Sequence, residues 1–204
     1  MSYKTLEEIA KEVHDCTKCP LYKGRTIAVP GSGNPKADIL FIGEGPGAKE
    51  DATGLPFVGA AGKFLDEMLA DSKMKREDVF ITNIVKCRPP ENRDPEPAEK
   101  DICTTLYLDA QIDLINPLLI VMLGRHSMEY FLPGFSISQV HGKPMRRKGR
   151  VYMPLFHPAA ALYNGSMRET LKTDFRKVPK LLEKIRSDRV EAESIIESMK
   201  KENQ

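Results

Sequence analysis

Four short, continuous apolar runs recur along this chain, and helix-like patterns separate them. The runs are Asp38–Gly43, Val79–Ile84, Leu118–Leu123 and Val151–Phe156. Apolar runs of this length, bounded by polar or glycine residues, are typical of strands buried on both faces of a parallel sheet. Alternation of strand and helix predicts an α/β sandwich with a central, mostly parallel sheet. Pro154 inside the fourth run indicates an edge position or a different strand boundary.

The segments between the runs carry helical periodicity. We expect helices over Leu6–Val13, Gly62–Ser72, Ala98–Ile115, His126–Leu132 and Met167–Ser187, and an irregular, Pro/Gly-rich stretch over Pro20–Pro35. A chain of 204 residues fits one domain. We assign residues 1–188 to that domain and residues 189–204 to a charged, solvated and partly frayed helical tail.

The overall charge does not indicate what kind of molecule the protein binds. Lys plus Arg number 31 and Asp plus Glu number 29, a formal net charge of +2, which is too weak to predict nucleic-acid binding by itself. One segment, Lys143–Arg150, places five positive charges in eight residues, Arg146 and Arg147 among them. It is either a solvated charge run or a contact to phosphates beside the last strand.

No apolar run reaches the length of a membrane span, about 18 residues. The first residues, Met1–Glu8, carry charges where a signal peptide needs an apolar stretch. We therefore expect a cytoplasmic protein with no membrane partner.

The four cysteines are expected to be thiols or metal ligands rather than disulfides in such a compartment. Cys16 and Cys19 form one C-x-x-C knuckle, whereas Cys87 and Cys103 are widely spaced. A structural zinc site usually shows two knuckles. An iron–sulfur cubane tolerates spread thiolates, because each iron takes one cysteine. The spacing alone leaves zinc, a [4Fe–4S] cluster and free buried thiols open.

The least regular sequence lies at the carboxyl end of each predicted strand. These segments are Gly43–Gly47, Asn83–Arg93, Gly124–Arg125 and His157–Ala161. In open α/β sheets, ligands bind outside the carboxyl ends of the strands. The four segments are therefore expected to line one crevice.

The glycine-rich loop after the first strand formally matches a dinucleotide fingerprint through Gly43, Gly45 and Ala48. That fingerprint requires a helix to begin at once, so that its N-terminus holds the pyrophosphate. Prolines and glycines intervene here before any helical pattern, which argues against a dinucleotide. Close approach of a ligand to the glycine backbone and a tight turn without a ligand remain the two interpretations.

Three side chains near these segments could recognise a base. The amide of Asn83 offers a donor and an acceptor, which match N3–H and O4 of uracil but not the reversed pattern of cytosine. Phe57 lies in a loop, where it serves as a stacking platform or as a core anchor. His157 is either a structural histidine or a group that stabilises charge developing on a leaving group.

Together the motifs resemble those of family 4 uracil-DNA glycosylases over about residues 16–175. The matching elements are the four cysteines, Gly43–Gly47 with Glu50-Asp51, Gly54–Lys63, Thr82–Pro90, Asn92-Arg93 and His157–Ala161. The resemblance implies an α/β/α fold on a four-stranded, mostly parallel sheet. It also implies a [4Fe–4S] cluster on Cys16, Cys19, Cys87 and Cys103, with a structural role.

The resemblance further implies excision of uracil from DNA after the deoxyuridine is flipped out of the stack. We expect a monomer that acts on double- and single-stranded DNA. Phe57 would stack on the uracil and Asn83 would read its Watson–Crick edge. His157 would stabilise the anion that develops on O2. Backbone groups of Gly43, Gly45 and Gly47 would bind the carbonyls, and Glu44 would exclude the methyl group of thymine.

Leu162, after the histidine motif, would wedge into the vacated base stack. The segment Tyr163–Arg168 departs from the family, which usually has an arginine soon after this leucine, and Arg168 is expected to take over a phosphate contact. The water-orienting aspartate of the best-known uracil glycosylases corresponds to Gly45, so no carboxylate is carried over. Nearby candidates are Glu44, Glu50 and Asp51.

Two other classes of protein fit parts of the pattern. One is a small redox protein with an iron–sulfur centre on a flavodoxin-like sheet. The other is a non-catalytic nucleic-acid-binding module stabilised by zinc. Redox titration, metal analysis and cleavage of a uracil-containing oligonucleotide discriminate among the three.

Overall fold

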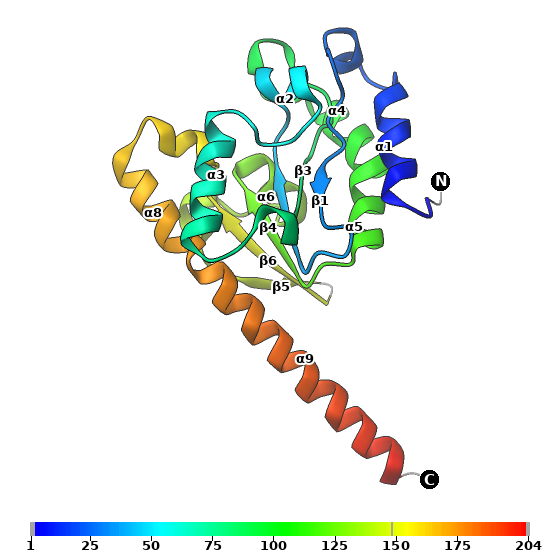
Figure 1. Cartoon of the computed structure of the whole chain (residues 1–204), viewed down its shortest axis with the longest axis vertical. Helices are drawn as coiled ribbons and strands as arrows, with labels where there is room; N and C mark the ends of the chain where they lie inside the picture. Colours follow the sequence, from blue (N-terminus) through cyan, green and yellow to red (C-terminus); the bar gives the residue numbers. More distant parts are fainter. Residues whose placement is uncertain (1–2, 148, 203–204) are drawn as a thin grey trace.

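The computed structural model describes residues 3–147 and 149–202, with side chains up to Glu191. All four apolar runs form strands: β2 (Ile39–Gly43), β3 (Phe80–Asn83), β4 (Leu119–Leu123) and β6 (Arg150–Leu155). They pair in parallel in the order β3-β2-β4-β6. The predicted parallel sheet is therefore confirmed, and it lies at the centre of the molecule (Figure 1).

Two short antiparallel strands extend this sheet to six strands, and neither was predicted from the sequence. β1 (Ser32–Gly33) pairs with β3 at one edge, and β5 (Met145–Arg147) pairs with β6 at the other. Neither is long enough to produce a hydrophobic pattern. β5 pairs only with the first half of β6, up to Tyr152. Pro154 lies beyond that paired part, where a missing N–H is tolerated.

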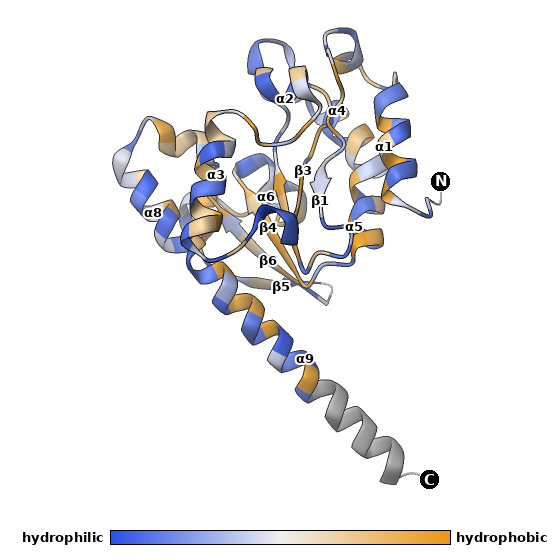
Figure 2. Cartoon of the chain, viewed as in Figure 1, coloured by the Kyte–Doolittle hydropathy of each residue, from blue (hydrophilic) through white to orange (hydrophobic). Residues whose placement is uncertain are grey.

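Helices cover both faces of the sheet, as the three-layer prediction requires. α1 (Leu6–Asp15), α4 (Pro97–Cys103), α5 (Asp109–Ile115) and α6 (Arg125–Phe131) contribute to the apolar core on one face. α3 (Ala60–Asp71), α8 (Gly165–Phe175) and α9 (Lys177–Glu202) contribute to the other. Residues of β2 alternate between the two cores, Leu40 with the first and Phe41 with the second. Figure 2 shows the hydrophobic strands between helices of mixed hydropathy.

Several helices differ from the predicted ones. The expected helix over Ala98–Ile115 is divided by a π-helical turn, Thr104–Leu108, directly after Cys103. The expected helix over Met167–Ser187 divides at Arg176, and Pro179 lies in the first turn of α9, where its missing N–H costs no helical hydrogen bond. The short helices α2 (Ala48–Thr53) and α7 (Ile137–Val140) were not predicted.

α9 runs through the predicted domain boundary at residue 188 and projects away from the body of the molecule (Figure 1). The expected helical tail is helical up to Glu202, and residues 203–204 lie outside the described part. Residues 189–202, which we assigned to a helical tail, form the outer half of the long helix α9. Among the described residues, none of the helices has the length and apolar character needed to cross a membrane.

Candidate functional site

A cavity of about 310 Å³ opens at the carboxyl ends of β2, β3 and β6. Its size is in the range of small-ligand pockets. It is lined by Glu44, Gly45, Pro46, Gly47, Glu50, Phe57, Ala61, Asn83, Pro89, Asn92, Arg93, His157 and Ala159. Three of the four predicted segments therefore meet here. The fourth does not line the cavity: Gly124 lies behind it, against the Cβ of His157.

Asn83 is the last residue of β3, and its side chain is only 1% exposed. Its Oδ1 has no hydrogen-bond partner among the described residues. A buried acceptor left unpaired costs about 1–3 kcal/mol, so this atom gains from a donor on a ligand. Gly43 pairs with Asn83 across the sheet, and a Cβ at Gly43 would overlap both the amide oxygen and the ring of Phe57. Only glycine leaves room for these two side chains.

Phe57 adopts a positive φ of 51°, which is rare for a bulky residue and is retained only where surrounding contacts hold it. Glu50, on α2, supplies such contacts: its Oε1 accepts the N–H groups of Val58 at 2.8 Å and Gly59 at 2.7 Å. Gly62 in α3 packs so closely that a Cβ there would overlap the Phe57 carbonyl. The ring is thereby fixed as a wall of the cavity while also joining the core.

His157 follows β6 and caps the 3₁₀ turn Pro158–Leu162. Its Nδ1 accepts the N–H of Ala159 at 3.1 Å, so in the neutral ring the proton resides on Nε2. Burial lowers the pKa of His157 from 6.5 to about 4, the nearby Glu50 opposing this shift. At neutral pH the cavity therefore contains an uncharged imidazole that can donate one hydrogen bond. Its ring centroid lies 5.7 Å from that of Phe57.

The three carboxylates considered as water-orienting groups have different surroundings. Asp51 is buried and accepts the N–H of Thr26, away from the cavity. Glu50 and Glu44 both line the cavity. Burial raises the pKa of Glu44, and the neighbouring His126 opposes that rise. Its Oε2 lies 3.7 Å from Nε2 of His126.

The four cysteines converge on one small cavity on the α1 and α4 side of the sheet, and none forms a disulfide. Burial raises the pKa of three of these thiols, that of Cys103 to about 12. Four thiolates in such a place require compensating positive charge, as iron or zinc ions supply. Arg25 contributes one hydrogen bond, from Nη1 to Sγ of Cys87 at 3.2 Å.

Lys86, between Asn83 and Cys87, is buried. Its Nζ donates to Oγ1 of Thr82 at 2.7 Å and to the Asn83 carbonyl at 2.8 Å. Burial lowers its pKa to about 8. Lys86 therefore braces the strand end that carries Asn83.

The residues predicted to contact DNA next to the catalytic motif have their own intramolecular contacts. Leu162 is half-buried against the core. Arg168 stacks on Phe64, with its Cζ 3.9 Å from the ring centroid, and donates to Glu67 at 2.5 Å. Tyr163, beside Leu162, is 94% exposed.

Arg146 and Arg147, in the basic segment Lys143–Arg150, lie away from the cavity. β5 is antiparallel to β6, and Arg147 pairs with Arg150 at the amino end of β6. The cavity lies past the other end of that strand, after Leu155, which is about 17 Å away at 3.3 Å per residue. Arg147 donates to the carbonyl of Phe131, and Arg146 lies 3.9 Å from Asp188.

Several residues at the site had no role assigned from the sequence. Asn92 and Arg93 line the cavity. Their loop contains two consecutive residues with positive φ, Glu91 and Asn92. Asp94 and His126 lie next to Glu44. His126 follows Gly124-Arg125 at the carboxyl end of β4, so the strand-end rule applied one residue further would have found it.

Comparison with known proteins gives consistent results. The family model described as the Uracil DNA glycosylase superfamily matches residues 30–185. The chain is 50% identical over 187 residues to a type-4 uracil-DNA glycosylase of Sulfurisphaera tokodaii, covering 87% of this chain and 84% of the relative. It is 46% identical to one of Archaeoglobus fulgidus (87% and 94% covered) and 45% identical to one of Thermotoga maritima (88% and 95% covered).

Proposed function

This chain belongs to the uracil DNA glycosylase superfamily, and from that premise we propose how its cavity excises uracil from DNA. The observation that carries the proposal is the meeting of Phe57, Asn83 and His157 around one cavity. Their three chemistries, an aromatic face, an amide and a neutral imidazole donor, are those that an extruded uracil requires. The enzyme would hydrolyse the N-glycosidic bond, release free uracil and leave an abasic site for base-excision repair.

Recognition begins with a flipped deoxyuridine. The Phe57 ring stacks on the base, which contributes about 1–3 kcal/mol. Oδ1 of Asn83 accepts N3–H of uracil, and the amide nitrogen donates to O4. Cytosine presents the reverse pattern at these positions and would leave the buried amide unmatched. Backbone groups of Gly43, Gly45 and Gly47 complete the cradle.

Bond cleavage develops negative charge on the uracil and positive charge on the sugar. Nε2–H of His157 donates to O2 as the C1′–N1 bond breaks, which stabilises the leaving anion. Because Nδ1 is held by the Ala159 N–H, the donor is preset and needs no proton from solvent. Water then attacks C1′. Glu44 and Glu50 line the cavity and are the carboxylates available to orient that water, with Glu44 also assigned to exclude thymine.

We further propose that Cys16, Cys19, Cys87 and Cys103 hold a [4Fe–4S] cluster. The convergence of four free, largely buried thiols and the donation from Arg25 support this assignment. When bound, the cluster supplies rigid cross-linking of α1, the loop after β3 and α4. Lys86, next to Cys87, donates a hydrogen bond to the carbonyl of Asn83, so the cluster would also restrict the movement of Asn83.

The physiological setting follows from the reaction. We propose that the protein acts as a monomer. We propose activity on both double- and single-stranded DNA in the compartment that holds the chromosome, the cytoplasm. We treat residues 1–188 as the glycosylase domain, with the outer part of α9 carrying no catalytic role.

Excision of uracil from a synthetic duplex tests the proposal. The protein is incubated with a single-uracil oligonucleotide, and alkali then cleaves at abasic sites. We expect scission with uracil opposite G or A and in single strands, and little scission at thymine. Asn83→Asp should lose at least about 100-fold in activity, because a carboxylate cannot donate to O4.

The control for folding is retention of the brown absorbance and of the thermal unfolding temperature in Asn83→Asp. Full activity of a folded Asn83→Asp variant would refute the assigned recognition. Reversible reduction of the wild-type protein without any uracil release would instead favour the redox alternative.

A further inference from the structure

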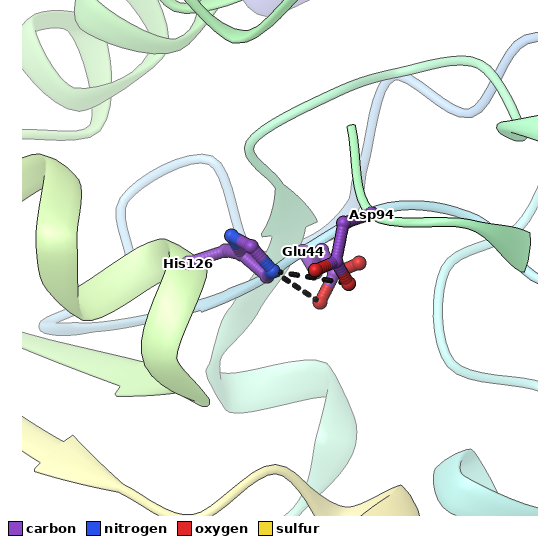
Figure 3. A group of neighbouring side chains, drawn as sticks. All are labelled: Glu44, Asp94 and His126. Carbon is purple, nitrogen blue, oxygen red and sulfur yellow. Dashed lines mark ion pairs between the residues drawn. The ribbon is translucent and has the colours of Figure 1, made fainter. Parts of the chain in front are cut away.

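Three side chains from separate segments meet at the rim of the cavity. Glu44 follows β2, Asp94 lies in the loop before α4, and His126 lies in the first turn of α6. Figure 3 shows the imidazole pointing at both carboxylates. Nε2 of His126 is 3.2 Å from Oδ1 of Asp94 and 3.7 Å from Oε2 of Glu44. One ligand atom from each residue lies within 4.8 Å of the others.

His126 adds a buried imidazole to the two carboxylates. Its side chain is only 7% exposed, yet neither ring nitrogen has a hydrogen-bond partner among the described residues. Nδ1 is 3.8 Å from the carboxylate of Glu129, too far for a hydrogen bond, and although Nε2 lies 3.2 Å from Oδ1 of Asp94, no hydrogen bond forms between them. An unpaired buried imidazole costs free energy, which a ligand at Nε2 would recover.

We propose that His126, Asp94 and Glu44 bind a divalent transition-metal ion. One imidazole nitrogen and two carboxylate oxygens form a mixed donor set that suits Mn²⁺, Fe²⁺ or Zn²⁺ better than the all-oxygen preference of Mg²⁺. Ligand atoms about 2.1 Å from such an ion lie about 3–3.5 Å from one another. The separations from Nε2 of His126, 3.2 and 3.7 Å, are close to this range, and the ligand atoms of the two carboxylates lie within 4.8 Å of each other, so these carboxylates have to move together to share an ion.

The surrounding charges permit a cation here. Arg125 pairs with Oδ2 of Asp94, which leaves Oδ1 facing His126. The carboxylates of Asp94 and Glu44 and the guanidinium of Arg125 sum to one negative charge, and Glu129 adds another beside His126. Asp94 is exposed, so the ion has a path from solvent. The competing arrangement is a protonated His126 that simply pairs with both carboxylates.

A bound ion would join two walls of the cavity. Glu44 belongs to the loop after β2, and Asp94 follows Asn92 and Arg93, which also line the cavity but come from the loop before α4. The ion would thus fix the width of the slot into which a base enters. This consequence rests on the proposed function, whereas the metal site itself does not.

Mn²⁺ titration of the full-length, cluster-containing protein tests the proposal, after removal of loosely bound metal with a chelator. Free Mn²⁺ is followed by its EPR signal in the absence of DNA. We expect one ion per chain, displaced by Zn²⁺. His126→Ala should weaken binding at least about tenfold. Asp94→Asn should do the same, and because this side chain is exposed the variant keeps its fold.

His141→Ala is the matched control. His141 also pairs with a carboxylate, Asp174 at 2.5 Å, but has no second carboxylate beside it in the described chain. Its removal should leave Mn²⁺ binding unchanged. Absence of stoichiometric binding by the wild type, or equal binding by Asp94→Asn and wild type, would overturn the metal site. Uracil release measured on the same preparations reports separately on the proposed function.

Discussion

The rings of His157 and Phe57 face the same cavity, with their centroids 5.7 Å apart. Different hydrogen bonds from backbone N–H groups hold the two rings in place. The imidazole is fixed by the Ala159 N–H on its Nδ1. The phenyl ring is fixed by a positive-φ turn that Glu50 clamps. Because both rings are held in place without a ligand, the geometry is preorganised for the roles proposed for them, His157 toward the leaving group and Phe57 toward the base plane.

The first prediction concerns the His157 donor. His157→Ala should lower the single-turnover rate of uracil release by about 10²–10³-fold, the usual effect of removing one preorganised donor. Binding of uracil-containing DNA should change much less. Rapid-quench measurement at saturating enzyme checks this, with His14→Ala, an exposed histidine, as the control. A His157→Ala variant as fast as wild type would contradict the role.

The pH profile should report the neutral imidazole. Its pKa of about 4 in the folded protein lies below the ordinary 6.5, so the unfolded chain binds the proton first. Stability from this group is therefore complete above pH 6.5 and declines as pH falls toward 4. The His157-dependent rate should be flat from about pH 5.5 to 8 and fall near pH 4. A rate that rises as the histidine protonates would instead indicate a cationic donor.

The second prediction uses a pair of helical glycines. Gly62→Ala should destabilise the fold by about 1–3 kcal/mol and weaken uracil binding, because the new Cβ would displace the Phe57 carbonyl. A Cβ at Gly165 in α8 would have no atom within 4 Å, so Gly165→Ala should be neutral or slightly stabilising. Urea unfolding and inhibition by free uracil measure both effects. Equal behaviour of the two variants would remove Gly62 from the positioning of Phe57.

The third prediction addresses the cysteines. Cys103→Ser should abolish the brown colour and lower the iron and sulfide content, since one iron loses its thiolate. The melting temperature should drop, because buried groups then lack their compensating charge. Ser72→Ala, at another buried polar side chain, is the control. A colourless wild type with one zinc per chain would replace the cluster by the zinc alternative.

The sequence predicted the parallel sheet and the meeting of strand-end loops, because apolar runs and their carboxyl ends are local patterns. It could not predict β1 or β5, whose short strands form only by pairing with an existing edge. It also could not place Arg146 and Arg147 relative to the cavity. Their position next to a strand in the sequence does not show at which end of the sheet they lie, and antiparallel pairing of β5 puts them at the amino end of β6.

The sequence predicted which side chains gather at the cavity, but not the contacts that hold them there. Asn83, Phe57 and His157 were identified from their motifs. The clamping of Phe57 by Glu50 and the burial of Lys86 depend on distances between segments that periodicity does not encode. His126 was not identified because the segment assigned to the carboxyl end of β4 stopped at Arg125, one residue before it.

The fourth prediction concerns the basic edge strand. The double variant Arg146→Ala/Arg147→Ala should lower the salt dependence of duplex binding, by about 0.9 in slope for each phosphate no longer neutralised. Excision at saturating DNA should not change, because these residues lie at the opposite end of β6 from His157. Fluorescence anisotropy between low and moderate salt measures the slope. An unchanged slope would show that the segment is merely a solvated charge run.

The last prediction concerns the side chain that fills the gap left by the flipped base. Leu162 was assigned this wedge, but it is half-buried against the core, whereas Tyr163 beside it is 94% exposed. An exposed aromatic ring can stack on the orphaned base, and stacking of this kind contributes about 1–3 kcal/mol. Tyr163→Ala should therefore reduce excision from duplex DNA about tenfold or more, while excision from single strands stays nearly unchanged because no stack must be refilled.

Leu162→Ala is the matched comparison. It should lower the free energy of unfolding through weaker packing and should affect both substrates alike. Single-turnover rates on duplex and single-stranded substrates, together with urea unfolding, separate the two residues. If Leu162→Ala selectively impairs the duplex substrate while Tyr163→Ala does not, the wedge is Leu162, which then has to leave its core contacts when DNA binds.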